Sequence, residues 1–136
     1  MYVFYKKVCQ EGWDAVHNSC YRILSGQVDQ WTGRADCEKV GGRLALVSTE
    51  AEMDAVGEYM SMNGILINHG AWVDGTDAVT DGVWLSESGD EMHITWWSFV
   101  EPNGQESENC LGISNKEAFD ISCSGDGFIQ YTLCEF

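Results

Sequence analysis

Six cysteines in 136 residues restrict what this chain can fold into more than any other feature. They are spread over the whole length, at Cys9, Cys20, Cys37, Cys110, Cys123 and Cys134. The count is even and no Cys-x-x-Cys pair is present, which disfavours zinc-ribbon and thioredoxin-type sites. We therefore expect three disulfides and a secreted, extracellular protein, because disulfides persist outside the cytosol. Counting alone leaves the pairing open.

The chain is strongly acidic. Its 22 Asp and Glu residues against 7 Lys and Arg residues give a formal net charge of −15 at pH 7. Such a surface repels nucleic-acid phosphates and anionic membranes, so we expect neither as a partner. The same charge concentrates cations near the protein, although solubility alone is an equally good explanation.

The length and the 44% of apolar residues suit one domain, which we place at residues 1–136. The first residues contain no apolar run of the kind found in a secretion signal, so we expect that a signal peptide has already been removed. No segment approaches the roughly 20 apolar residues of a membrane span.

Two stretches in the first half have helical periodicity. The first is capped by Asp29, ends at Gly41-Gly42, and places Trp31, Ala35 and Val40 near one apolar face. The second covers about residues 49–62 and begins with a capping box. Its core positions recur at the spacing of one helix face, at Met53, Val56, Gly57 and Met60.

After the second helix, short strand candidates alternate with turn-forming residues. They cover 71–73, 83–85, 110–113, 119–123 and 128–134, with an earlier one at 43–47. Two helices followed by strands predict an α+β domain. The segment between Ser86 and Asn109 has no convincing element, and loops of this length in compact domains are usually functional.

The end of that segment is rich in oxygen ligands. Glu101, Asn103, Glu108 and Asn109 offer carboxylate and amide oxygens, the ligands of a hard cation such as calcium. Pro102 stiffens the loop, and a cis Glu101–Pro102 bond would place the flanking side chains on one side. An ordinary solvated loop has the same composition, so the pattern alone leaves both interpretations open.

Together these features resemble the C-type lectin-like domain, in its long form with an additional N-terminal disulfide. The resemblance rests on motifs that follow the family's order along nearly the whole chain. They are Cys20-Tyr21, Trp31 with Ala35 and Cys37, Gly42-Arg43-Leu44-Ala45, 71–77, Gly82-Val83-Trp84, Trp97, Glu101-Pro102-Asn103, Glu108-Asn109-Cys110, 120–123 and 134–136. The resemblance implies a C-type lectin fold, in which two helices pack on short antiparallel sheets and a long loop binds the metal.

The resemblance also implies the disulfide pairing. Cys9 would pair with Cys20, Cys37 with Cys134, and Cys110 with Cys123. The second bond would tie the first helix to the last strand, and the third would brace the metal loop.

In sugar-binding members of the family, the long loop holds calcium through Glu-Pro-Asn, a following Glu and an Asn-Asp pair on the next strand. Glu101, Asn103, Glu108 and Asp120 match this ligand set. Phe119, however, stands where the family has the Asn. We expect this change to weaken the site; it need not abolish it, because water can take a vacant position around calcium.

The resemblance further implies a sugar class, since Glu-Pro-Asn accompanies mannose, N-acetylglucosamine and glucose in the family. Glu101, Asn103 and Glu108 would exchange hydrogen bonds with sugar hydroxyls. Phe119 would support a sugar ring face, and Gln105 would touch a second sugar. One exposed site of this kind binds weakly, so a homo-oligomer would supply avidity.

An auxiliary calcium position of the family draws on the loop 77–82. Asp77 and Asp81 match in place, with Asn109 where an Asp is common and Gly104 where another Asp can sit. The alternative is an acidic turn before a strand.

Two other function classes compete with a lectin. We do not expect an enzyme, because no nucleophile motif surrounds His17, His69 or His93 and every cysteine is assigned to a disulfide. A lectin-like module for a protein ligand, or one using zinc through His69 or His93, is the stronger alternative. We favour a secreted, calcium-dependent lectin of the mannose type. Recognition of microbial glycans is a common use of such domains.

Overall fold

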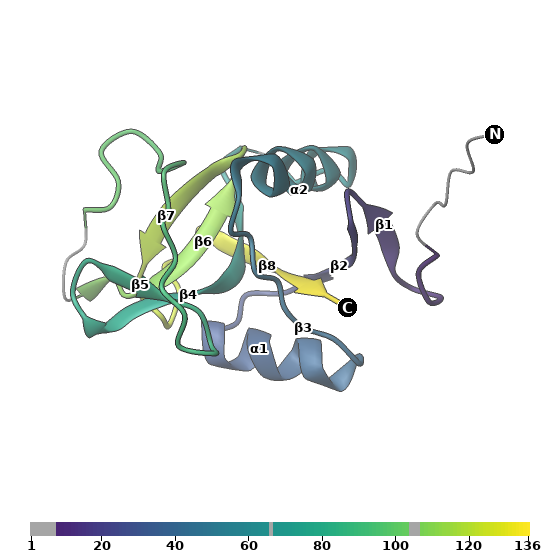
Figure 1. Ribbon diagram of the computed structural model, residues 1–136, viewed down its shortest axis with the longest axis horizontal. Coiled ribbons are helices and arrows are strands. Elements are labelled where there is room, and N and C mark those ends of the chain that lie inside the picture. The colour runs from purple at the N-terminus through teal and green to yellow at the C-terminus, as the bar shows by residue number, and fades with distance from the viewer. Residues whose placement is uncertain (1–7, 66, 104–106) are drawn as a thin grey trace.

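Two helices lie on opposite sides of one mixed β-sheet in the computed structural model (Figure 1). The structure describes residues 8–65, 67–103 and 107–136. The predicted α+β class is confirmed, and within the described ranges no helix is long and apolar enough to cross a membrane.

The sheet contains short strands at its edges and longer strands in its middle. Its strands are β1 (Asp14–Val16), β2 (Ser19–Ser25), β3 (Arg43–Leu44), β4 (Gly70–Thr80), β5 (Val83–Leu85), β6 (Cys110–Ser114), β7 (Glu117–Ile121) and β8 (Ile129–Glu135). The strands follow the order β1-β2-β8-β4-β6-β7, while β3 pairs with β8 and β5 with β4. The long loop, residues 86–109, joins β5 to β6 and extends from one end of the sheet (Figure 1).

One strand pairing differs from the prediction of antiparallel sheets. β4 and β8 run parallel, with Trp72 opposite Thr132, whereas the other named pairs are antiparallel. A parallel pair needs a long crossover connection, and here β5, the long loop, β6 and β7 all lie between the two strands in sequence. Local periodicity cannot reveal a pairing of that range.

Helix α1 (Gln30–Lys39) begins after the predicted cap, because the Asp29 side chain accepts the Thr32 N–H at 2.6 Å. Its buried face is not the predicted one. Trp31 is 79% exposed, and the face toward the sheet carries Gln30, Gly33 and Cys37 instead. The expectation of a core face containing Trp31 was therefore wrong.

Close approach of α1 to the sheet explains this unusual face. A Cβ on Gly33 would lie 2.8 Å from Thr132 Oγ1 of β8, so the position needs glycine. Gln30 is buried because its Nε2 donates to the carbonyls of Val73 and Gly75, both at 3.0 Å. A glycine and an amide carry no apolar signal, which hid this face from the periodicity.

Helix α2 (Glu50–Met62) follows its prediction closely. The Thr49 hydroxyl accepts the Glu52 N–H at 3.1 Å, and the buried residues are the four predicted ones. The Glu52 carboxylate completes the cap by accepting the Thr49 hydroxyl at 3.0 Å. The N-terminal turn of α2 is thus fixed by a short network of side-chain hydrogen bonds.

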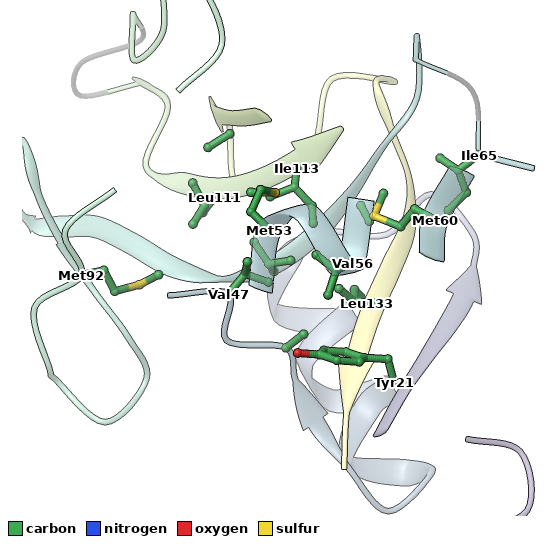
Figure 2. Packing of buried hydrophobic residues seen from close by; sticks show 14 of the residues in the cluster. Tyr21, Val47, Met53, Val56, Met60, Ile65, Met92, Leu111, Ile113 and Leu133 are labelled. Carbon is green, nitrogen blue, oxygen red and sulfur yellow. The ribbon is translucent and has the colours of Figure 1, made fainter. Parts of the chain in front are cut away.

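The main core lies between α2 and the middle of the sheet. Met53, Val56 and Met60 of α2 point toward Leu111 and Ile113 of β6 and toward Leu133 of β8 (Figure 2). Met92 joins this cluster from the long loop and is only 8% exposed. The loop is therefore anchored in the core and does not simply hang from the ends of two strands.

The three disulfides join Cys9 to Cys20, Cys37 to Cys134 and Cys110 to Cys123, which are the pairs implied by the resemblance. Cys37–Cys134 ties α1 to β8 across 97 residues of sequence. Cys110–Cys123 joins the start of β6, which directly follows the long loop in sequence, to the segment after β7.

Candidate functional site

Backbone hydrogen bonds fasten the long loop to the sheet. The Met92 N–H donates to the Trp84 carbonyl at 2.7 Å, and the Ser98 N–H donates to the Ala118 carbonyl of β7 at 2.9 Å. The rings of Trp84 and Trp97 are in contact, with centroids 5.3 Å apart. These contacts bring the following residues of the loop alongside β7.

The Glu-Pro-Asn motif is tied to β7 through Asp120. The Glu101–Pro102 peptide bond is cis. The Asn103 N–H donates to both oxygens of the Asp120 carboxylate, at 3.0 and 3.1 Å. In return, the Asp120 N–H donates to Glu101 Oε2 at 3.4 Å. The two motifs predicted to share a cation are therefore in direct contact.

A surface cavity of about 280 Å³ lies between the loop and the end of β7. It is lined by Glu101, Asn103, Glu108, Phe119, Asp120, Ile121, Asp126 and Phe128. All four residues predicted as ligands of the primary calcium site are among these, together with Phe119. None of the lining residues is basic, so no protein cation neutralises the cavity from its own wall.

Two carboxylates of the cavity, Glu101 and Glu108, resist ionisation. Burial, a hydrogen bond to Asp120 and the charge of Asp120 raise the pKa of Glu101 to about 8. Burial raises the pKa of Glu108 as well, and the charges of Asp120 and Asp126 add to the effect. Like charges held close together favour protonation, or a cation that offsets the repulsion.

The chemistry of this donor set fits a hard divalent cation. Carboxylate and amide oxygens surround the cavity, and nitrogen and sulfur donors do not. Across residues 8–65, 67–103 and 107–136, no three His, Cys, Asp or Glu side chains are already arranged to hold a metal ion. A cation would therefore draw these side chains inward from their present positions.

The residues of the predicted auxiliary site also lie together. Asp77 is 5% exposed; its N–H donates to the Asn109 carbonyl at 3.1 Å, and its Oδ2 accepts the Gly82 N–H at 3.0 Å. The other oxygen, Oδ1, is buried and has no hydrogen-bond partner among the described residues. Burial raises the pKa of Asp77, as do the charges of Asp81 and Asp120, while the Gly82 bond opposes the shift. An unpartnered buried oxygen beside two further carboxylates fits a cation at this position too.

Four other predicted residues are not among those that line the cavity in the described part of the chain, two because they fall outside it. Gln105, predicted to touch a second sugar, lies outside the described residues, as does Gly104 of the auxiliary site. His69 and His93, the zinc ligands of the alternative hypothesis, do not line the cavity. The geometry near the Glu-Pro-Asn motif thus offers oxygen donors and no imidazole.

Three lining residues were missed from the sequence, namely Ile121, Asp126 and Phe128. Asp126 and Phe128 belong to the turn between β7 and β8, and Phe128 packs on Phe119 with ring centroids 5.1 Å apart. The sequence signal that would have found the turn is an acidic residue between Gly125 and Gly127. Its position beside the cavity depends on the strand pairing and was not readable locally.

Sequence comparison connects the chain to known lectins. A family model described as the lectin C-type domain matches residues 26–136. The galactose-specific lectin nattectin of Thalassophryne nattereri is 26% identical over 113 residues, or 82% of this chain and 70% of nattectin. C-type lectin domain family 3 member A of Homo sapiens is 28% identical over 131 residues, or 95% of this chain and 64% of that protein. The chain thus spans about two thirds of the length of these relatives.

Solved structures share the fold. The C-type carbohydrate-recognition domain of cow CD23, crystallised with a GlcNAc2Man3 oligosaccharide, has a TM-score of 0.77 at 21% identity, covering 95% of each chain. Human lithostathine has a TM-score of 0.80 at 20% identity, covering 95% of this chain and 90% of lithostathine. A calcium-independent type II antifreeze protein has a TM-score of 0.76 at 20% identity, covering 95% of this chain and 94% of its own. The same fold therefore occurs in a protein that does not depend on calcium.

Proposed function

Because the chain belongs to the C-type lectin domain family, we propose that it binds calcium and, beside the calcium, terminal sugars of the mannose type. Its relatives and structural neighbours are non-enzymatic lectins or lectin-like proteins, and this chain is likewise a binding domain and not an enzyme. The site we propose is the cavity between the long loop and the end of β7.

The observation that supports this proposal best is the gathering of Glu101, Asn103, Glu108 and Asp120 around one cavity with no basic lining residue. Two of these carboxylates have raised pKa values because burial and like charges oppose their ionisation. Calcium would offset that repulsion and present its remaining coordination positions to hydroxyl oxygens.

The side chains of the cavity offer complementary groups to a sugar. The carboxylates of Glu101 and Glu108 would accept hydrogen bonds from two neighbouring hydroxyls, and the Asn103 amide would donate one. The rings of Phe119 and Phe128 would face the C–H surface of the sugar ring. Hydroxyl recognition sets the orientation, while the apolar contact adds area.

Mannose, N-acetylglucosamine and glucose are the sugars we propose, on the strength of the Glu101-Pro102-Asn103 sequence. One relative, nattectin, is named as specific for galactose, a different sugar, but it is only 26% identical to this chain. At that identity the two sites can differ, so the motif carries more weight than the overall similarity.

We further propose that the protein is secreted and acts on glycans outside the cell, including those of microbial surfaces. The three disulfides support an oxidising compartment. A homo-oligomer would supply avidity, because a shallow site on one domain binds a single sugar weakly.

A protein ligand is the second candidate function. Phe99 and Val100 precede the Glu-Pro-Asn motif and are 91% and 66% exposed. Two adjacent apolar side chains on a loop tip are a suitable anchor for a protein partner. In that case the acidic cavity would serve to shape the loop.

Retention on immobilised mannan separates these functions. We expect retention in calcium and elution both by a chelator and by free mannose. Glu101→Gln should abolish retention, whereas Glu58→Gln on the exposed surface of α2 makes the same charge change away from the cavity and should not. Loss of retention in calcium, or retention only with zinc, would favour the second candidate or another metal.

A further inference from the structure

Asp126 occupies a position that the family motif does not foresee. We propose that its carboxylate acts as a cation ligand in place of the amide that is missing at Phe119. This inference rests on the proposed function, since it concerns the same cavity, and it adds a residue from the β7–β8 turn to the ligand set.

The turn is built to hold Asp126 at the cavity. Gly125 and Gly127 on either side have φ angles of +86° and +88°, a conformation that glycine adopts without strain. The Phe128 N–H donates to Asp126 Oδ1 at 3.0 Å. This bond uses one carboxylate oxygen and orients the group, and Asp126 is one of the residues that line the cavity.

Phe119 supports this arrangement through its ring. Phe119 and Phe128 pack with centroids 5.1 Å apart and ring planes inclined by 56°. Phe128 is the residue whose N–H orients Asp126, so the ring contact connects position 119 to the turn. The side chain that removes an expected ligand therefore helps to fix the turn that brings in another.

Asp126 lines the same cavity as Glu108, and its charge acts on that carboxylate. It is among the groups that oppose ionisation of Glu108, after burial and Asp120. Glu101, Glu108, Asp120 and Asp126 thus place four carboxylates around one cavity. All four carboxylates attract an approaching divalent cation. The fourth, Asp126, contributes a negative charge where the family pattern has only the neutral amide of an Asn at position 119.

A carboxylate in place of an amide affects calcium affinity and sugar affinity differently. A carboxylate supplies more attraction for calcium than an amide does. It accepts hydrogen bonds but cannot donate one, so it does not restore the amide N–H toward a sugar hydroxyl. Calcium affinity is maintained in this arrangement, while the sugar loses one of its hydrogen-bond donors.

Calcium titration by calorimetry tests the role of Asp126, with Asp126→Asn as the variant. The amide oxygen of the variant can still accept the Phe128 N–H, so the turn keeps its hydrogen bond. We expect calcium affinity to fall about tenfold, because one negative charge leaves the ligand set. Asp54→Asn on the exposed face of α2 makes the same charge change and should leave the affinity unchanged.

Melting in a chelator gives a second, independent readout. Without calcium, Asp126→Asn removes repulsion at the cavity and should raise the melting temperature, the opposite of its effect on calcium binding. Asp54→Asn should not show this reversal. A higher melting temperature also demonstrates that the variant is folded.

The outcomes separate the inference from the function on which it rests. Calcium binding by the wild type with equal affinity in Asp126→Asn would overturn the role of Asp126 and leave the proposed function standing. Absence of calcium binding by the wild type would overturn both.

Discussion

Asp120 and Glu101 are in contact without a cation, since the Asp120 N–H donates to Glu101 Oε2 at 3.4 Å, and burial together with the contact to Asp120 raises the pKa of Glu101. Strand β7, through Asp120, and the Glu-Pro-Asn motif, through Glu101, therefore hold each other in place. The same contact makes the calcium-free protein sensitive to pH.

We expect the calcium-free protein to lose stability as the pH rises. Folding raises the pKa of Glu101 from 4.5 to about 8, so the folded state binds a proton more tightly than the unfolded chain. This contribution is fully present below about pH 4.5 and is lost as the pH rises through about 8. Glu108 and Asp77 shift in the same direction. Thermal melts in a chelator across this range measure the slope.

Calcium should flatten that slope, because it stabilises the ionised carboxylates. Glu101→Gln should reduce the slope in the chelator, and Glu58→Gln should not. A melting temperature in the chelator that stays constant or rises over this pH range would contradict the electrostatic description of the cavity.

The sugar class is testable by exchanging two motif residues. Glu101→Gln together with Asn103→Asp should move the preference from mannose toward galactose, because the exchange reverses which side of the site carries the carboxylate and which the amide. Elution from mannan and from immobilised galactose by each free sugar measures the change. Unchanged preference in a variant that still binds calcium would show that another part of the cavity selects the sugar.

Replacing Phe119 with Asn should change binding affinity and protein stability in opposite directions. Phe119→Asn restores an amide beside the cavity and should tighten both calcium and sugar binding. The same change removes the ring contact with Phe128, which should lower the free energy of unfolding in a chelator by about 1 kcal/mol. Phe119→Leu is the control, because it also loses the ring contact but adds no amide. If Phe119→Asn alters neither affinity, the assignment of the site is wrong.

Close packing of α1 on β8 predicts a steric cost at Gly33. A Cβ there would lie 2.8 Å from Thr132 Oγ1 and 3.1 Å from its Cγ2. We expect Gly33→Ala to destabilise the protein by about 1–3 kcal/mol, through overpacking. In a Thr132→Ala background the cost of the same change should be smaller, which a double-mutant cycle by chemical denaturation would measure. Equal costs in both backgrounds would argue against the clash.

Much of this fold could be predicted because local patterns determine it. The spacing of Met53, Val56 and Met60 identified α2 and its buried face, and runs of apolar residues located the strands from β3 onward, although not β1 and β2. The face of α1 was missed, since helix packing there depends on Gly33 and on a buried Gln30, neither of which is apolar. The parallel pairing of β4 and β8 was missed because it is set by tertiary topology.

The residues of the candidate site can likewise be divided into those that local sequence identifies and those that depend on tertiary topology. Glu101, Asn103 and Glu108 are close in sequence, so a motif could identify them, and Asp120 follows from the resemblance. Asp126 reaches the cavity only because β7 and β8 place their connecting turn beside the long loop. A ligand contributed by a turn in this way has no fixed spacing from the others.

The Phe136 N–H donates to the Cys20 carbonyl at 2.9 Å, and the Phe136 ring packs on Trp13 with centroids 5.4 Å apart, so the C-terminal residue is fastened to the N-terminal hairpin. The long loop lies at the other end of the molecule (Figure 1). A support joined to the end of the molecule where Phe136 contacts Trp13 would therefore leave the cavity at the opposite end, facing away from that support. Several copies mounted side by side would present their cavities to one common surface.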